Sequence, residues 1–163
     1  MGSTGIRQSG LTDAILAYTA QGGQYASKYP FSSEMNRQLL EATSNNEITL
    51  SQDIYRKIDV SESKRDEIFN SLLDSNNWDF DSNTLQSFTK ERTRAFSYGG
   101  SQQQYILLRI PAGTKVNGLD IASKSLYPQE QEILLGKNKL SGSYDDLQWT
   151  SSGNMIITLR RRR

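Results

Sequence analysis

The sequence predicts an α+β domain in which helices come first and antiparallel strands follow. Up to about residue 75, apolar residues recur at the spacing of amphipathic helices. From about 78 to 160, short segments alternate apolar with polar residues, and Pro, Gly and Asn separate them. Helices and strands are therefore segregated along the chain, which disfavours an alternating βαβ array.

Three helices are expected in the first half. The first starts near residue 11, runs toward residue 29 with a break at 22–23, and is closed by Pro30. The second opens at 32–33, where Ser33 is an imperfect capping residue, and ends at 45–46. The third covers 63–73 and places Ile68, Leu72 and Leu73 inward.

Eight strands are expected after or between these helices. They lie at 54–58, 84–89, 105–110, 116–121, 130–135, 140–144, 147–150 and 155–159. The run Tyr-Ile-Leu-Leu-Arg-Ile at 105–110 is the strongest of them, and Ser-Ser-Gly-Asn at 151–154 predicts a hairpin between the last two. The chain carries neither a GxGxxG nor a P-loop pattern, so it does not indicate a Rossmann or NTPase domain.

Length and charge indicate one domain without a general affinity for polyanions. The 163 residues fit a single domain over 11–163, preceded by a leader or expression remnant at 1–10. The helical part is expected at about 11–75 and the mostly β part at about 78–160. A net charge of +1 gives no overall attraction to nucleic acid or membrane, and no apolar run is long enough to span a bilayer.

The chain contains no Cys and no His. These absences exclude disulfides, Cys-rich or His-containing zinc sites, and Ser-His-Asp or Cys-His nucleophilic sites. Any acid–base chemistry must therefore fall to Asp, Glu, Lys or Tyr.

Glu130-Gln131-Glu132 is the segment most suggestive of chemistry. On the expected strand at 130–135, both glutamates share one face, with Cα atoms roughly 6 to 7 Å apart. Two carboxylates this close favour protonation of one member, which raises its pKa. Taken alone, such a pair is more often a solvated strand start.

Three elements in order resemble the arginine-type mono-ADP-ribosyltransferases, the R-S-E class with a Glu-x-Glu motif. They are Tyr55-Arg56 on an early strand, Ser87-Phe88-Thr89 with Phe in place of the family's middle Thr, and Glu130-Gln131-Glu132. Tyr18, Tyr25 and the runs at 35–40 and 107–113 are also similar to this family. The resemblance spans roughly 11–160 and implies a split antiparallel β-sandwich with N-terminal helices and NAD in the cleft between sheets.

The resemblance implies a role for each motif residue. Arg56, beside Tyr55, would grip the NAD pyrophosphate or ribose through its planar fork of donors. Ser87 would hold Glu132, the catalytic glutamate that stabilises positive charge on the ribose. Thr89 would support the sheet or the NAD site, and Phe88 would point into the core.

Acceptor recognition is expected in the loop at about 123–129 and at Glu130. A carboxylate at Glu130 can pair bidentately with an arginine guanidinium and help remove its proton. Tyr127 lies where the family's acceptor loop carries an aromatic, although a packing aromatic at a turn is an equal alternative.

The segment 92–104 corresponds in the resemblance to the loop that closes over nicotinamide and phosphate. Phe96 or Tyr98 would stack on nicotinamide, and Arg92 or Arg94 would meet phosphate. Either aromatic is equally acceptable as a core residue.

The implied activity is transfer of ADP-ribose from NAD, as a substrate and without a metal, to an arginine of a target protein. Such domains occur as bacterial toxins, as modules of secreted or injected effectors and as phage-encoded modifiers that act in the cytoplasm of a target or host cell. A cognate inhibitor or immunity protein is a further partner that this implies. The basic run at 160–163 is interpreted as the end of the last strand, with nucleic-acid binding the less favoured reading.

Three alternatives remain open from the sequence. The site can mainly hydrolyse NAD, or it can use a nucleic-acid or small-molecule acceptor. The domain can also be an inactive module of the same fold with an interaction or structural role.

Overall fold

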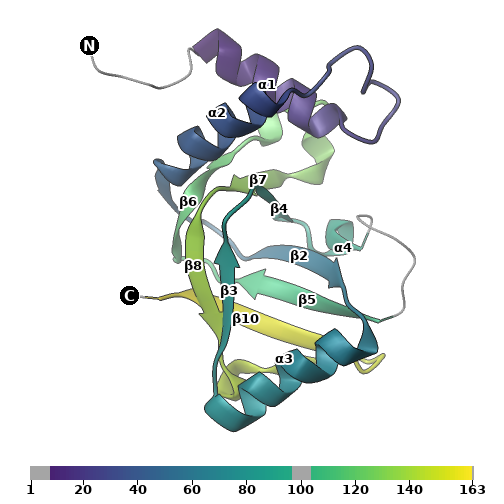
Figure 1. The fold of residues 1–163 in the computed structure, drawn as a ribbon, viewed down its shortest axis with the longest axis vertical. Helices are drawn as coiled ribbons and strands as arrows, with labels where there is room; N and C mark the ends of the chain where they lie inside the picture. Colours follow the sequence, from purple (N-terminus) through teal and green to yellow (C-terminus); the bar gives the residue numbers. More distant parts are fainter. Residues whose placement is uncertain (1–7, 97–103, 163) are drawn as a thin grey trace.

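The computed structural model describes residues 8–96 and 104–162 (Figure 1). Its α-helices are α1 (Gln8–Ala20), α2 (Ser33–Ser44), α3 (Glu62–Ser75) and α4 (Arg92–Ala95). Three 3-10 helices follow, η1 (Ala122–Lys124), η2 (Pro128–Glu130) and η3 (Tyr144–Asp146). The strands are β1 (Glu47–Thr49), β2 (Ile54–Asp59), β3 (Trp78–Ser82), β4 (Gln86–Thr89), β5 (Tyr105–Ile110), β6 (Lys115–Asp120), β7 (Glu132–Leu135), β8 (Asn138–Gly142), β9 (Gln148–Trp149) and β10 (Met155–Arg161).

The first two helices differ from expectation at their ends. Helix α1 begins at Gln8, inside the segment expected as a leader, and ends at Ala20 rather than near residue 29. Gly22 follows with φ 73°, a left-handed conformation that a helix cannot contain. In α2 the capping residue is Ser32, not Ser33, because the Ser32 hydroxyl accepts the Met35 N–H.

Helix α3 confirms the third expected helix, but one inward residue is wrong. Ile68 and Leu72 are buried, whereas Leu73 is 52% exposed. Leu73 follows Leu72 by one position, about 100° around the helix, so both cannot face the same core.

The strands form one strongly curled sheet in the order β1-β6-β7-β4-β2-β5-β10-β8-β3, and β9 pairs with β10 as the expected hairpin. The pairings are antiparallel except that β10 runs parallel to β5. Strand β3, which the sequence did not suggest, closes one end by pairing with β8. Strand β1, also missed, lengthens the other end by pairing with β6.

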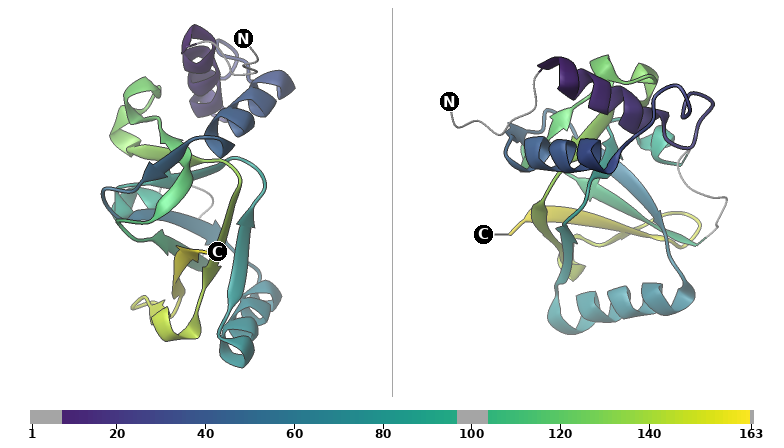
Figure 2. Two further views of the ribbon diagram at one scale, coloured as in Figure 1. Left: turned by 90° about the vertical axis from the view of Figure 1, so that its left-hand side faces the viewer. Right: turned by 45° about the horizontal axis from the view of Figure 1, so that its top comes forward.

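Helices pack against the sheet at two opposite ends of the molecule. Helices α1 and α2 cover the end formed by β6 and β7, and α3 lies at the other end beside β3 (Figures 1 and 2). The larger core includes Phe88, which is fully buried as expected. A smaller core under α1 and α2 includes Ile15, Leu39 and Leu134. No helix among the described residues has the length and hydropathy that a bilayer crossing requires.

The basic run at the C-terminus is bound to acidic side chains. Arg160 pairs with Asp146, and Arg161 pairs with Glu47. Arg162 pairs with Asp79 and Asp81. The strand reading of this run is therefore confirmed as far as Arg161, and residue 163 lies outside the described part.

Candidate active site

Three adjacent strands bring the expected motif residues together. Strand β4 lies between β2 and β7, so Arg56 of β2, Ser87 of β4 and Glu132 of β7 come from neighbouring strands. The register pairs Thr89 with Tyr55 on one side and with Glu132 on the other. Motifs far apart in sequence thereby meet at one place on the sheet.

These side chains line a cleft of about 430 Å³, within the roughly 300–1,000 Å³ typical of ligand sites. Its lining residues come from the end of α1, the loop after it, β2, β4, η2 and β7. They are Tyr18, Thr19, Gln21, Gly22, Gly23, Arg56, Ser87, Tyr127, Glu130 and Glu132. Five expected site residues, Arg56, Ser87, Tyr127, Glu130 and Glu132, are therefore in one cleft, and the loop after α1 was not foreseen.

Gly23 in that loop is a close-approach position. A Cβ at Gly23 would meet the Tyr127 hydroxyl at 3.2 Å, so a side chain there would crowd this aromatic. The Gly22-Gly23 pair, read from the sequence only as a helix breaker, thus also admits Tyr127 to the cleft.

Arg56 has a hydrogen-bond donor without a partner. Its Nη1 donates to the Ser87 carbonyl at 2.9 Å, but its buried Nε has no partner among the described residues. Burial lowers the pKa of Arg56, while the nearby Tyr18 and Glu132 act in the opposite direction. Buried polar atoms without partners are rare, and each calls for an explanation such as a catalytic role or a bound water or ion.

Ser87 connects Tyr18 to Glu132. The Ser87 Oγ lies 2.6 Å from the Tyr18 hydroxyl and is also hydrogen-bonded to the Glu132 carboxyl group. Either hydroxyl can donate in this contact; when Glu132 is ionised its carboxylate only accepts, so Ser87 then donates to Glu132 and Tyr18 donates to Ser87. The Tyr18 ring is fixed edge-on against Phe31 at 5.7 Å. The sequence placed Tyr18 on a helix, but nothing in it indicated this contact across 69 positions.

Glu132 is a buried carboxyl group, with 5% of the residue exposed. Burial raises its pKa, and the charge of Glu130 raises it further. The hydrogen bond from Ser87 and the positive charge of Arg56 oppose this rise by stabilising the ionised form. Opposing influences of this kind are typical of functional carboxylates.

Glu130 does not lie on the strand, so the expected strand geometry of the pair is wrong. Strand β7 starts at Glu132, Glu130 ends η2, and Gln131 between them is left-handed with φ 50°. The two glutamates nevertheless line one cleft. The turn, rather than side-chain alternation, brings them together.

Thr89 supports this turn and does not line the cleft. Its buried hydroxyl donates to the Glu130 carbonyl at 2.6 Å and accepts the Glu91 N–H at 3.0 Å. The Lys90 N–H also donates to the Gln131 carbonyl. Of the two roles expected for Thr89, its contacts fit support of the structure.

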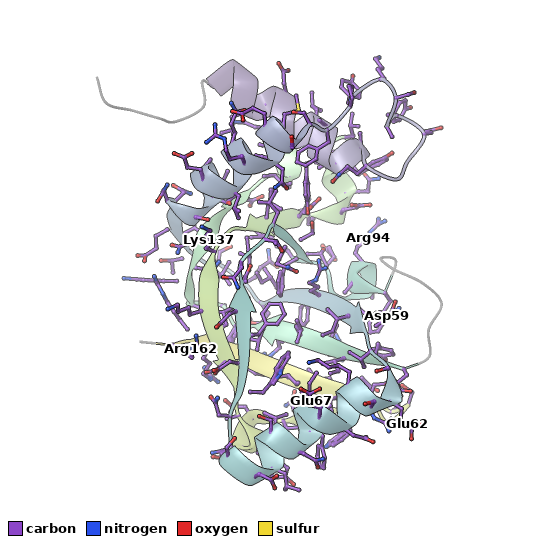
Figure 3. The ribbon with its side chains drawn as sticks, viewed as in Figure 1. Asp59, Glu62, Glu67, Arg94, Lys137 and Arg162 are labelled. Carbon is purple, nitrogen blue, oxygen red and sulfur yellow. The ribbon has the colours of Figure 1, made fainter. Side chains whose placement is uncertain are left out.

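The remaining expected NAD-binding residues lie beside the cleft lining rather than in it. Tyr55 packs with Ala95 and has the Arg92 guanidinium 6.0 Å from its ring centroid. Phe96, 42% exposed, packs edge-on against another aromatic, Tyr105, at 5.5 Å. Arg94 is exposed on α4, at the edge of the molecule in Figure 3. Tyr98 lies outside the described residues, so the choice between Phe96 and Tyr98 stays open.

Comparison with known proteins identifies the fold. No protein-family model matches this sequence, and no curated protein matches it. Among solved structures, the ADP-ribosyltransferase toxin Plx2a from Paenibacillus larvae is similar, with a TM-score of 0.62 at 15% identity over 97% of this chain and 88% of that one. C3stau2 from S. aureus, solved with NAD, gives 0.59 at 18% identity, covering 96% and 88%.

A third similar structure is that of Vis, an ADP-ribosyltransferase from Vibrio splendidus. In its complex with agmatine the TM-score is 0.54 at 16% identity, covering 95% of this chain and 68% of Vis. The chain thus has the ADP-ribosyltransferase fold, which confirms the expected α+β architecture. Within the described residues, no group of three or more carboxylates is arranged to hold a metal ion.

Proposed function

We propose that this protein is an NAD-dependent mono-ADP-ribosyltransferase that modifies arginine on a target protein. The observation that carries the proposal is the convergence of Arg56, Ser87, Glu132 and Glu130 in one cleft of an ADP-ribosyltransferase fold. Without Cys or His, the chain offers this site an arginine, hydroxyls and two carboxylates.

NAD binding rests on Arg56 and its surroundings. The Arg56 Nε has no hydrogen-bond partner among the described residues. A pyrophosphate or ribose oxygen of NAD would supply the missing acceptor. Arg92 and Arg94 on α4 supply further positive charge beside the motif strands. Neither side chain forms a salt bridge within the described residues. The solved NAD complex of C3stau2 shows that a protein of this fold can bind NAD.

Bond breaking requires stabilisation of a cation. When the bond between nicotinamide and ribose breaks, both bonding electrons leave with nicotinamide, and positive charge develops on the ribose carbon. An ionised Glu132 placed beside that carbon stabilises the charge, as carboxylates do in glycoside hydrolysis. The hydrogen bond from Ser87 orients the Glu132 carboxylate and favours its ionised form, against the burial that raises the pKa of Glu132.

Transfer requires an acceptor nitrogen next to the same carbon. Glu130 lines the cleft with Tyr127, and its carboxylate can pair with a guanidinium and take the proton released when the nitrogen bonds to ribose. Vis, of the same fold, was solved with agmatine, a small guanidine. We propose a target protein inside a host or target cell as the partner of this reaction, and a cognate inhibitor or immunity protein as a second partner.

The experiment uses labelled NAD with agmatine and, separately, with a cell lysate. We expect labelled agmatine and a labelled protein band whose label hydroxylamine releases, as it does for arginine linkages. Free ADP-ribose with no labelled acceptor would identify an NAD glycohydrolase instead. Label on nucleic acid would show that nucleic acid, and not a protein arginine, is the acceptor. No loss of NAD at all would indicate an inactive module of this fold.

A further inference from the structure

An exposed aromatic patch lies at the end of the molecule opposite the cleft. It consists of Phe69 and Leu73 of α3, Tyr144 of η3 and Trp149 of β9. Leu73 and Trp149 are each 52% exposed, and Tyr144 is 43% exposed. The Phe69 ring joins the others, with its centroid 6.3 Å from Tyr144 and 5.9 Å from Trp149.

The composition of the aromatic patch is that of a binding surface. Single exposed apolar residues are ordinary, but contiguous ones mark interaction sites, and Trp and Tyr dominate the residues that contribute most to binding. Among the described residues, three of the five exposed large hydrophobic side chains belong to this patch. The other two, Tyr25 and Phe96, lie on separate elements.

The aromatic patch is held in a fixed arrangement. Asn76, which ends α3 in a left-handed conformation, accepts the Tyr144 N–H at 2.7 Å through its Oδ1. Its Nδ2 donates to the Asp145 carboxylate at 3.0 Å. These bonds join the end of α3 to η3, so a partner meets a preformed surface and less ordering entropy is lost on binding.

The border of the aromatic patch is acidic. Glu62 and Asp66 precede Phe69 and Leu73 at helical spacing, so all four side chains share one stripe of α3. Asp145 borders the other side, next to Tyr144. Asp66 has only an exposed contact with Arg65 at 3.5 Å, and the salt bridges within the described residues do not include Glu62 or Asp145.

We propose that the aromatic patch docks a basic amphipathic segment of a partner protein, with an apolar side chain against Trp149 and Leu73 and cations against the acidic border. Charge complementarity selects this occupant. Helix α3 and the helices next to the cleft lie at opposite ends of the molecule (Figure 1), so a docked partner leaves the cleft open. The proposal therefore stands independently of the proposed reaction.

A second copy of the chain fits less well. In a two-fold symmetric dimer the same surfaces meet, which would bring two acidic borders together. Figure 3 shows the cations Lys137 and Arg162 along one edge of the molecule, away from Glu62 and Glu67 on α3. A contact between that edge and the aromatic patch would be head-to-tail and would not close into a dimer.

The test uses a fluorescein-labelled amphipathic peptide of Lys and Leu, with a peptide of Glu and Leu as its counterpart. Anisotropy measures binding to the full chain. Trp149 emission reports the site directly in a Trp78→Phe variant, because the chain has two Trp residues. We expect saturable binding of the basic peptide, a blue shift of Trp149 emission, and weaker binding when salt rises from about 50 to about 300 mM.

Matched variants locate the binding. Trp149→Ala and Leu73→Ser should each raise Kd at least about fivefold, and Asp145→Asn should raise it about twofold. Tyr25→Ala, which removes a similarly exposed aromatic on another loop, and Asp13→Asn on α1 should leave Kd unchanged.

Three results would overturn the docking proposal. The first is equal binding of the acidic peptide. The second is a Kd that Trp149→Ala and Leu73→Ser change no more than Tyr25→Ala does. The third is a blue shift that rises with protein concentration alone, accompanied by dimers in sedimentation, which would assign the aromatic patch to a second copy of the chain.

Discussion

At the residue scale, Glu132 is a carboxyl group that the fold keeps buried and yet must ionise for the proposed chemistry. Glu132→Gln keeps the shape and removes the charge that would stabilise the ribose cation. We expect loss of NAD turnover by roughly 10²-fold or more. Turnover of labelled NAD measures this, and unchanged turnover would show that Glu132 does not act on NAD.

The wild-type pH profile follows from the same residue. Because burial raises the pKa of Glu132, turnover should fall as pH drops through a value above the ordinary 4.5 of a glutamate. A profile that stays flat down to pH 4.5 would contradict this assignment.

Glu130 and Glu132 should be separable by their products. Glu130 lines the cleft but ends η2, and only Gln131 separates it from strand β7. Glu130→Ala should reduce transfer to agmatine at least about tenfold while some NAD hydrolysis persists, because Glu130 is proposed to serve the acceptor. Separate measurement of ADP-ribosyl-agmatine and free ADP-ribose tests this. Intact transfer in the variant would remove Glu130 from the acceptor site.

The contact of Tyr18 with Ser87 is a feature of the site that only the structure revealed. Tyr18→Phe keeps the packing against Phe31 and removes the donor to Ser87. Ser87 then holds the Glu132 carboxylate less firmly, so the pKa of Glu132 should rise. We expect kcat to fall several-fold and the acidic limb of kcat/KM to move to higher pH. Tyr25→Phe is the matched control, and a lower kcat without any shift of the limb would indicate a packing role alone.

At the element scale, the sequence predicted the main helices and most strands because their apolar spacing is strong. It missed β3, Trp-Asp-Phe-Asp-Ser, a short strand in which two aromatic residues alternate with two aspartates. These acids pair with the C-terminal arginine Arg162. The apolar–polar alternation of β3 is a strand signal, but it covers only five residues, and the pairing with β8 that completes the strand lies far away in sequence.

The candidate site was predictable where motifs carried it and not where turns did. Arg56, Ser87 and Glu132 were identified from their motifs, and neighbouring strands bring them together. The position of Glu130 was not predictable, because it depends on a left-handed Gln131, a conformation that Gln rarely adopts. Strand alternation correctly predicted that Glu130 and Glu132 lie on the same side, but a turn and not a strand places Glu130 there.

Thr89 tests whether the turn before β7 sets acceptor geometry. Thr89→Val keeps the shape but leaves the Glu130 carbonyl and the Glu91 N–H without their buried partner. We expect a loss of about 1–3 kcal/mol in the free energy of unfolding, and a larger drop in transfer than in NAD hydrolysis. Urea unfolding and the product ratio measure the two effects.

Thr84→Val provides the comparison for that change. Thr84 lies just before β4 and does not contact η2 among the described hydrogen bonds. If Thr89→Val lowered transfer and hydrolysis in the same proportion as each other, the turn would have no special role in acceptor placement.

At the whole-molecule scale, the net charge is near zero, yet two carboxyl groups have pKa values shifted in opposite directions. Asp53 fixes the start of β2 to the turn after β5: its carboxylate accepts the Ala112 N–H at 2.8 Å and pairs with Arg109 at 2.7 Å. These contacts, chiefly the hydrogen bond from the Ala112 N–H, lower the pKa of Asp53 below its ordinary 3.8. Glu132 is the opposite case, since burial raises its pKa above 4.5.

The two carboxylates should therefore affect stability with opposite signs. Asp53 stabilises the fold above pH 3.8, and this contribution is lost as pH falls through its lower folded pKa. Glu132 binds its proton more tightly in the folded state, so stability falls as pH rises from 4.5 through its raised pKa. At pH 7, Asp53→Asn should lower Tm by roughly 2–4 °C or more, and Glu132→Gln should raise it by a similar amount. Thermal unfolding from pH 3 to 8 measures both, and each difference from wild type should shrink toward the acidic end. A Glu132→Gln variant that is less stable than wild type at pH 7 would show that its ionised form is a net stabiliser, contrary to the desolvation argument.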